Sequence, residues 1–382
     1  MRILILRGTG AMGTYLVQIL KQKNCELYVT SRTFHESKEI NYILGDAKND
    51  VFLKSILNIK YDAIIDFMVY STEKFRCRYK LLLEATKQYF YFSSARVYAN
   101  SDLLTEDSQR LLDSSIHSQY IQSDEYAIAK AKQEDILRNS DFKNWTIVRP
   151  YITYSDSRLQ LGFFEKELWL YRAIKGKTII FPSDINEKIT TLTYGGDVAN
   201  AIVELIGKNI AMGNTYQIMQ NRAIKWGDVL KIYMSVLGDN LKVTYVNDSN
   251  ALGEVTNRKE QIKYDRLYDR KFDNSKICSI DPLMIDAKKP EDGLKECLLR
   301  FINNGAKFDK IDWKFEGYAD KITKEKAIPF HLFDLSCFQL KTSLLTICFQ
   351  TSNNLLQRDI GETLQYGLSG QRMGYFYMNG KQ

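Results

Sequence analysis

The 382-residue sequence is poor in the residues that bind metals or form disulfides. It contains three histidines and six cysteines, and no two of the cysteines are spaced as a C-x-x-C pair. This scarcity argues against a zinc site and against a disulfide scaffold. We therefore expect no metal, and a reducing compartment fits best.

Apolar runs are short as well. The chain begins Met-Arg-Ile-Leu-Ile-Leu-Arg, and its four apolar residues between two arginines are too few for the core of a signal peptide. No other run approaches the roughly 20 residues that a membrane-spanning helix needs. We therefore expect a soluble, cytoplasmic protein with no membrane partner.

Charge of one sign is not gathered into a block anywhere in the chain. Lysine and arginine number 53 against 46 aspartates and glutamates, which gives a net charge of +7. Nucleic-acid-binding proteins usually carry a basic stripe, so nucleic acid is not the expected partner. Apolar residues make up 45% of the chain, too many for a disordered protein, and the length suggests about two domains.

The first 150 residues alternate short apolar runs with longer amphipathic stretches, a pattern typical of βαβ units. The expected strands are Arg2 to Leu6, Glu26 to Ser31, Asn41 to Leu44, Asp62 to Phe67, Tyr89 to Ser93 and Trp145 to Val148. The expected helices lie near Ala11 to Lys23, Asp50 to Leu57, Ser71 to Thr86 and Tyr120 to Leu137. We predict an α/β fold with a Rossmann-type, doubly wound parallel sheet, whose ligand lies beyond the carboxyl ends of the strands.

From residue 151 the pattern is less regular and predicts a smaller, mixed α/β C-terminal domain. Its expected helices are Gly162 to Lys175, Gly195 to Ile206, Trp226 to Leu237 and Glu291 to Asn303, with extended pieces at Thr178 to Phe181 and Lys242 to Val246. We assign residues 151–326 to a substrate-binding region with segments that return to the first domain. Residues 327–382 form an extension of unknown role, too apolar for a free tail, which either docks on the same chain or contacts another subunit.

A glycine-rich loop follows the first expected strand. Its G-x-G-x-x-G spacing comprises Gly8, Thr9, Gly10, Ala11, Met12 and Gly13. The glycines permit a tight turn, close approach of the backbone to a diphosphate, and close packing of the helix on the strand. Because the loop lies between a strand and a helix, we predict that residues 1–150 form an NAD(P)-binding domain.

The end of the second expected strand indicates which dinucleotide binds. In NAD-binding proteins an acidic side chain usually holds the adenosine ribose there, but this strand ends with Ser31 and Arg32. A guanidinium can pair with a 2′-phosphate, so NADP(H) is favoured and NAD(H) remains an alternative. After the next strand, Asp46 is placed either to accept a bond from the adenine amino group or simply to end the strand in a turn.

Catalytic chemistry is indicated by Tyr126 and Lys130, which lie four residues apart on one expected helix. This spacing puts the phenol and the ammonium on the same face, where the cation favours the phenolate. Such a tyrosine can act as a general acid or base. Ser94, at the end of an expected strand, could donate a hydrogen bond to the same substrate oxygen. We predict hydride transfer with a nicotinamide cofactor.

In these motifs the sequence resembles the extended short-chain dehydrogenases/reductases, or NAD-dependent epimerase/dehydratase family. The resemblance runs in order over residues 1 to about 305, through the glycine loop, Gly45-Asp46, Ser93-Ser94, Thr105-Glu106-Asp107, Tyr126-x-x-x-Lys130, Val148-Arg149-Pro150, Asp197-Val198-Ala199 and Asp273-Asn274-Ser275-Lys276. It implies a catalytic triad of Ser94, Tyr126 and Lys130, with Lys130 also holding the nicotinamide ribose. It further implies a nucleotide-diphosphate sugar as substrate and a homodimer.

Three departures from the family pattern bear on the chemistry. Arg7 stands where the family has the first glycine of its loop. Family 4,6-dehydratases carry an acidic pair after the catalytic hydroxyl residue, but here Ala95 and Arg96 follow Ser94, so dehydration is not expected. Phe67 replaces a small residue and puts a bulky ring near the cofactor.

The resemblance leaves the substrate and the reaction open. Substrate-binding candidates are Ser94, Arg96, Arg266 and Arg270. An epimerase and a ketoreductase acting at a sugar carbon, expected to be C4, would use the same triad. Two alternatives are a reductase of a non-sugar carbonyl and an RNA-binding or scaffold protein that kept the fold, since one branch of the family resembles RNA-binding proteins of chloroplasts.

Overall fold

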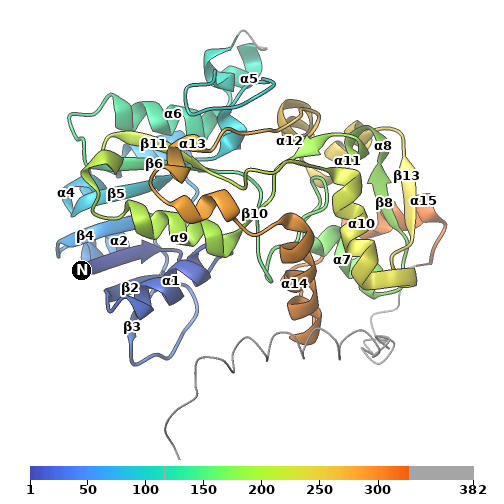
Figure 1. Cartoon of the computed structure of the whole chain (residues 1–382), viewed down its shortest axis with the longest axis horizontal. Helices are drawn as coiled ribbons and strands as arrows, with labels where there is room; N and C mark the ends of the chain where they lie inside the picture. The colour runs from blue at the N-terminus through green and yellow to red at the C-terminus, as the bar shows by residue number, and fades with distance from the viewer. Residues whose placement is uncertain (115–117, 327–382) are drawn as a thin grey trace, which may run out of the picture. The chain divides into compact units, whose positions relative to one another are not determined.

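The computed structural model describes residues 1–114 and 118–326, which are built around one seven-stranded parallel sheet (Figure 1). The strand order is β11-β6-β5-β4-β1-β2-β3. The strands are β1 (Arg2–Leu6), β2 (Glu26–Ser31), β3 (Ile40–Leu44), β4 (Tyr61–Asp66), β5 (Thr86–Phe92), β6 (Trp145–Pro150) and β11 (Asn214–Ile218). This topology confirms the predicted Rossmann-type α/β fold.

Apolar side chains cover both faces of the sheet, which explains why its strands are nearly continuous apolar runs. On one face, Ile3 and Ile5 pack with α1 (Gly13–Gln22) and α9 (Gly195–Leu205). On the other, Leu4 and Leu6 belong to the core covered by α2 (Asp50–Ile56), α3 (Thr72–Arg76), α4 (Tyr79–Glu84) and the end of α6 (Tyr126–Arg138). The alternation along β1 therefore supplies two separate cores.

Two expected helices are divided in the structure. The stretch near residues 71–86 forms α3 and α4, interrupted at Cys77 and Arg78. Arg78 is buried there, because its guanidinium donates to the carbonyl oxygens of Ala47 and Lys48 and pairs with Asp50. The stretch near residues 120–137 forms α5 (Ser118–Gln122) and α6. The sequence analysis also missed β11, which pairs with β6 at the edge of the sheet.

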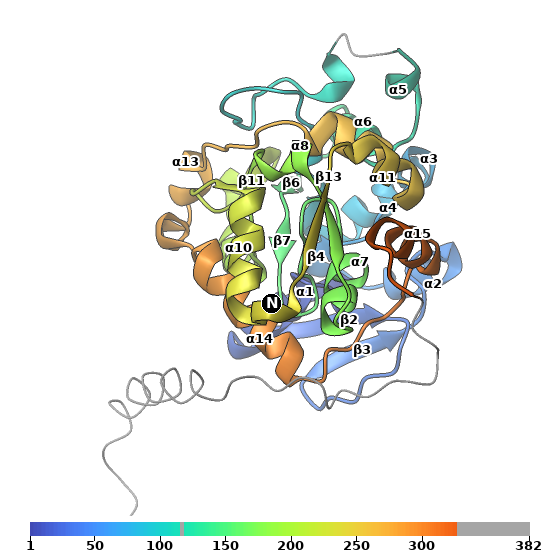
Figure 2. The same ribbon diagram turned by 90° about the vertical axis from the view of Figure 1, so that its right-hand side faces the viewer.

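The region after residue 150 is mixed, as expected, and lies beside the carboxyl ends of the sheet strands (Figure 2). Its short strands pair as β7 (Thr153–Tyr154) with β10 (Thr193–Tyr194), β9 (Ile189–Thr190) with β12 (Ile224–Lys225), and β8 (Ile179–Pro182) with β13 (Val243–Val246). Its longer helices are α7 (Lys166–Ile174), α10 (Trp226–Leu237), α11 (Ser249–Thr256), α14 (Pro290–Asn303) and α15 (Trp313–Thr323).

The described residues group into one compact unit, so the domain boundary at residue 150 stays a prediction. The extension at 327–382 lies outside the described residues. None of the helices in the described part of the chain has the length and apolar character that crossing a lipid bilayer requires.

Buried charges attach the last described helix, α15, to the rest of the fold. Arg172 is fully buried and donates to Glu316 and Asp320 at 2.9 Å. Lys177 also donates to Asp320, at 2.8 Å. Burial raises the pKa of Glu316 to about 7, although the nearby cations oppose this shift. Ion pairs therefore make up much of this contact.

Candidate active site

The glycine loop connects β1 to α1 with little free space around two of its glycines. A Cβ atom at Gly8 would lie 2.8 Å from the Val29 side chain, and one at Gly13 would lie 2.5 Å from the Gly8 carbonyl oxygen. Gly10, in contrast, faces open space, since a Cβ there would meet nothing within 4 Å. An open glycine before the N-terminus of α1 fits the phosphates of a dinucleotide, which the backbone can approach closely there.

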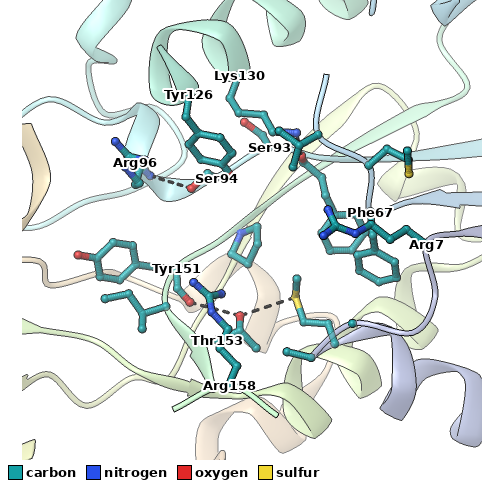
Figure 3. Close-up of a pocket in the computed structure, with 18 of the residues that line it drawn as sticks. Arg7, Phe67, Ser93, Ser94, Arg96, Tyr126, Lys130, Tyr151, Thr153 and Arg158 are labelled. Atoms are coloured by element: carbon teal, nitrogen blue, oxygen red, sulfur yellow. Dashed lines mark hydrogen bonds between the residues drawn. The ribbon is translucent and has the colours of Figure 1, made fainter. Parts of the chain in front are cut away.

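A cavity of about 440 Å³ opens beside this loop at the carboxyl ends of the sheet strands (Figure 3). The loop residues that line it are Gly10, Ala11, Met12 and Gly13. Further lining residues from the sheet and α6 are Arg7, Phe67, Met68, Val69, Phe92, Ser93, Ser94, Arg96, Tyr126, Lys130 and Pro150. The other wall comes from the region after residue 150, so the cavity lies where a doubly wound sheet binds its ligand.

The three residues of the expected triad line this one cavity. Tyr126 is the first residue of α6, and Lys130 follows one turn later. The Lys130 ammonium donates to the Phe92 carbonyl oxygen at 2.6 Å and lies 6.0 Å from the centre of the Tyr126 ring. Ser94 accepts a bond from the backbone N–H of Arg96 at 3.2 Å. Because its oxygen is the acceptor there, the Ser94 hydroxyl keeps its proton for donation into the cavity.

Burial controls the charge of Lys130. Its side chain is 2% exposed, and this desolvation lowers the pKa of Lys130 to about 8, although the carboxylates of Asp66 and Glu134 oppose the shift. An amine with this pKa is charged at neutral pH but close to losing its proton. It can therefore respond to a change of charge at the neighbouring phenol.

A buried ion pair fixes the helix that carries Tyr126 and Lys130. Glu134, one turn beyond Lys130, accepts bonds from Arg149 on β6 at 2.6 and 2.8 Å, and both side chains are buried. Burial alone would raise the pKa of Glu134, but the pairing with Arg149 lowers it to about 2. The position of α6 against β6 thus depends on a permanently charged pair.

Arg96 lies beside Tyr126. Its guanidinium carbon lies 5.1 Å from the centre of the Tyr126 ring, and its Nη2 pairs with Glu125 at 2.7 Å. Ala95 is buried. The two positions that hold acids in family dehydratases therefore hold a buried methyl group and a cation beside the phenol.

Three further arginines, Arg158, Arg258 and Arg266, line the end of the cavity formed by the region after residue 150. Arg158 pairs with Glu165 at 3.1 Å, and Arg266 donates to the Tyr151 hydroxyl at 3.2 Å. Burial lowers the pKa of Arg258, and neighbouring guanidinium groups add to this shift, although the Glu165 carboxylate opposes it. Arg266 also pairs with Asp265, so two of these three guanidinium groups have a carboxylate partner.

The structure does not bring Arg270 to the cavity. Its fully buried guanidinium donates to the carbonyl oxygens of Tyr98, Ala99 and Tyr264 and pairs with Asp265 at 3.0 Å. It stabilises the segment that carries Arg266. The sequence analysis missed Arg158 and Arg258, because neither belongs to a motif and they come together only in the folded chain.

The residues expected around the adenosine lie apart from this cavity. The Ser31 hydroxyl bonds the His35 ring at 3.0 Å, and the neighbouring Arg32 is exposed at the end of β2. The exposed Asp46 accepts a bond from the backbone N–H of Lys48, so it takes part in the turn after β3. The adenosine contacts of Ser31, Arg32 and Asp46 therefore stay predictions.

The fold and the site together define a Rossmann-type protein with a glycine-rich phosphate loop and a Ser, Tyr and Lys constellation at the strand ends. Residues 3–218 match the NAD dependent epimerase/dehydratase family, and the chain belongs to that family.

Individual relatives are more distant. The chain is 25% identical over 251 residues to the chloroplast stem-loop binding protein of 41 kDa b of Arabidopsis thaliana, an alignment that covers 60% of this chain and 61% of that protein. Solved structures of other proteins share this fold. The dTDP-glucose 4,6-dehydratase of Bacillus anthracis with NAD has a TM-score of 0.61 and 17% sequence identity, and the match covers 80% of this chain and 98% of that one. The UDP-glucose 4-epimerase of Bifidobacterium longum with NAD+ and UDP has a TM-score of 0.61 and 17% identity, and the match covers 81% of this chain and 100% of that one.

Proposed function

We propose that this protein is an NAD(P)-dependent enzyme that moves hydride at a sugar carbon, C4, of a nucleotide-diphosphate sugar. The observation that carries the proposal is the convergence of Ser94, Tyr126 and Lys130 with the glycine loop on one cavity. Family membership and NAD in two structures of the same fold support a nicotinamide cofactor. NADP(H) is favoured over NAD(H) by Arg32.

Each residue of the triad has a distinct part in the reaction. A bound nicotinamide supplies the acceptor and donor for hydride. The Tyr126 phenolate takes the proton from the substrate hydroxyl as the carbonyl forms, and it returns that proton on reduction. The Lys130 ammonium stabilises the phenolate and would also hold the nicotinamide ribose. The Ser94 hydroxyl donates a hydrogen bond to the same substrate oxygen.

The arginine-rich end of the cavity supports a substrate with a diphosphate. Guanidinium groups bind phosphate oxygens with two parallel hydrogen bonds, and Arg158, Arg258 and Arg266 all line this cavity. Arg96 and Ser94 would then contact the sugar. UDP in the Bifidobacterium structure shows that this fold accommodates a nucleoside diphosphate.

The reaction type follows from the residues beside Tyr126. A dehydratase needs acids where this chain has Ala95 and Arg96, so we propose an epimerase or a ketoreductase. The two differ in how long the cofactor stays bound. Denaturing the purified protein and identifying the released nucleotide by mass separates them: retained dinucleotide favours an epimerase, and an empty site that binds added NADPH favours a reductase.

We also propose that the protein forms a homodimer. Light scattering, which measures the molar mass in solution, tests this proposal.

Substitution of the catalytic tyrosine tests the proposal most directly. Tyr126→Phe removes the proton donor but keeps the ring, so we expect turnover of UDP- and dTDP-hexoses to fall by about a hundredfold or more. Dinucleotide affinity, measured by calorimetry, should stay unchanged. Turnover close to that of the wild type would refute the assigned role of Tyr126.

Binding of a nucleic-acid stem-loop is a second candidate function, favoured by the similarity to the Arabidopsis stem-loop binding protein. It predicts an affinity for an RNA hairpin that falls steeply with salt, because bound cations are released. A hairpin titration between 50 and 200 mM salt, roughly the range over which such contacts weaken, tests it. A hairpin affinity that is absent or independent of salt would leave the enzyme as the remaining proposal.

A further inference from the structure

The residue that begins the phosphate loop, Arg7, has an unusual backbone conformation. Its φ angle is +61°, in the left-handed region that favours glycine. Four other non-glycine residues of the described chain have positive φ, and Asn24, Asn257, Ala306 and Lys324 all follow the ends of helices. Arg7 instead follows a strand. A strained residue that persists at a ligand-binding loop is a reason to look for a function.

The surrounding backbone holds Arg7 in this conformation. Its N–H donates to the Thr30 hydroxyl at 2.9 Å, and Thr30 is buried on β2. The next residue, Gly8, has no room for a Cβ atom between Val29 and Ile5. The left-handed turn is therefore required by the loop. Glycine would satisfy it without strain, so the arginine side chain needs a separate explanation.

That side chain is exposed and lines the catalytic cavity, where Figure 3 shows it reaching from the end of β1 toward Phe67. Within residues 1–114 and 118–326 its guanidinium has no hydrogen bond or ion pair with another side chain. The carboxylate that lines the cavity, Glu165, pairs with Arg158. Arg7 is thus a cation that faces the cavity without a protein anion.

The strand order indicates which anion Arg7 meets. β1 lies between β4, which leads to Phe67 and the catalytic residues, and β2, which ends at Ser31 and Arg32. A dinucleotide that extends from the reaction site to the end of β2 must cross the end of β1 with its middle part. The middle part of a nicotinamide dinucleotide is its diphosphate.

We propose that the Arg7 guanidinium binds the diphosphate of the dinucleotide, opposite the N-terminus of α1. This inference rests on the proposed function, because it requires the cavity to bind NAD(H) or NADP(H). A guanidinium donates two parallel hydrogen bonds to phosphate oxygens, which backbone N–H groups at a glycine would not supply. The strained backbone at Arg7 thus accompanies a side chain that supplies a cation to the cofactor.

The test compares dinucleotide affinity with stability in Arg7→Gly. Glycine relieves the strain and removes the cation, so we expect the apoprotein to melt at the same or a higher temperature. Affinity for NAD+ and for NADP+, measured by calorimetry, should fall by about ten- to a hundredfold, because a hydrogen-bonded charge is lost. Arg7→Lys should restore part of the affinity, since lysine keeps the charge without the planar fork.

Lys324→Gly is the matched control, because Lys324 is also an exposed cation with positive φ, at 56°, but lies outside the cavity lining. It should change the melting temperature and leave both affinities unchanged. Unchanged affinity in Arg7→Gly, with a wild type that binds both dinucleotides, would overturn this inference alone. A loss confined to NADP+ would also overturn it, since the diphosphate is common to both dinucleotides. A wild type that binds neither refutes the proposed function and this inference together.

Discussion

The buried Lys130 makes the stability of the protein depend on pH in an unusual direction. Burial lowers the pKa of Lys130 from 10.5 to about 8 in the folded state. Between these two values the unfolded chain holds the proton more tightly than the folded chain. Stability contributed by this residue therefore increases as the pH rises through this window, since the folded protein sheds a charge that is costly to bury.

The size of the effect follows from the two pKa values. At pH 7 the lysine is charged in both states, and the shift costs about 3 kcal/mol of folding free energy. At pH 9 the folded state has mostly lost the proton, and the cost falls to about 2 kcal/mol. Relative to a variant without the amine, the wild type should gain about 1 kcal/mol between pH 7 and pH 9.

Lys130→Met is the variant that isolates this effect, because methionine is unbranched and carries no charge. Urea unfolding of both proteins at pH 7, 8 and 9 gives the difference in unfolding free energy, in which titrating groups that do not interact with Lys130 cancel. We expect that difference to move by about 1 kcal/mol in favour of the wild type. A difference that stays constant over this range would show that Lys130 does not have the lowered pKa, and the reasoning from burial would be refuted.

Two other substitutions test Arg32 and Glu134. Arg32→Asp should lower the ratio of NADP+ to NAD+ affinity in calorimetry, because a carboxylate repels a 2′-phosphate; an unchanged ratio would remove Arg32 from the cofactor site. Glu134→Gln should lower the unfolding free energy in urea at pH 7 by about 3–5 kcal/mol, because Arg149 stays buried without its anion. This deficit should persist down to about pH 4.5 and shrink toward pH 2, since the pKa of Glu134 is lowered to about 2. A variant as stable as the wild type would argue against the pair.

The parts of the site that were predictable from the sequence are those fixed by short stretches of chain. The glycine loop occupies six consecutive residues between a strand and a helix, so its geometry follows from local rules. Tyr126 and Lys130 are one helical turn apart, so any helix over them aligns both side chains. Ser94 could be placed because strands of a parallel sheet end at a common edge.

The parts that were missed depend on contacts between distant segments. Arg158 and Arg258 are a hundred residues apart and share a cavity wall only because the region after residue 150 folds back on itself. Arg270 and Arg266 look alike in the sequence, yet Arg270 is enclosed by three carbonyl oxygens. The break between α3 and α4 likewise follows from Arg78, whose partners lie about 30 residues earlier in the chain.

The attachment of α15 sets a limit on how far the chain can be shortened from its C-terminal side. A truncation before Trp313 would remove Glu316 and Asp320, the carboxylate partners of Arg172 and Lys177. Such a fragment would lose these ion pairs together with the packing of α15, so we expect it to be less stable than the longer chain. An expression fragment of this protein should therefore extend through Glu325, whose carboxylate also pairs with Arg172.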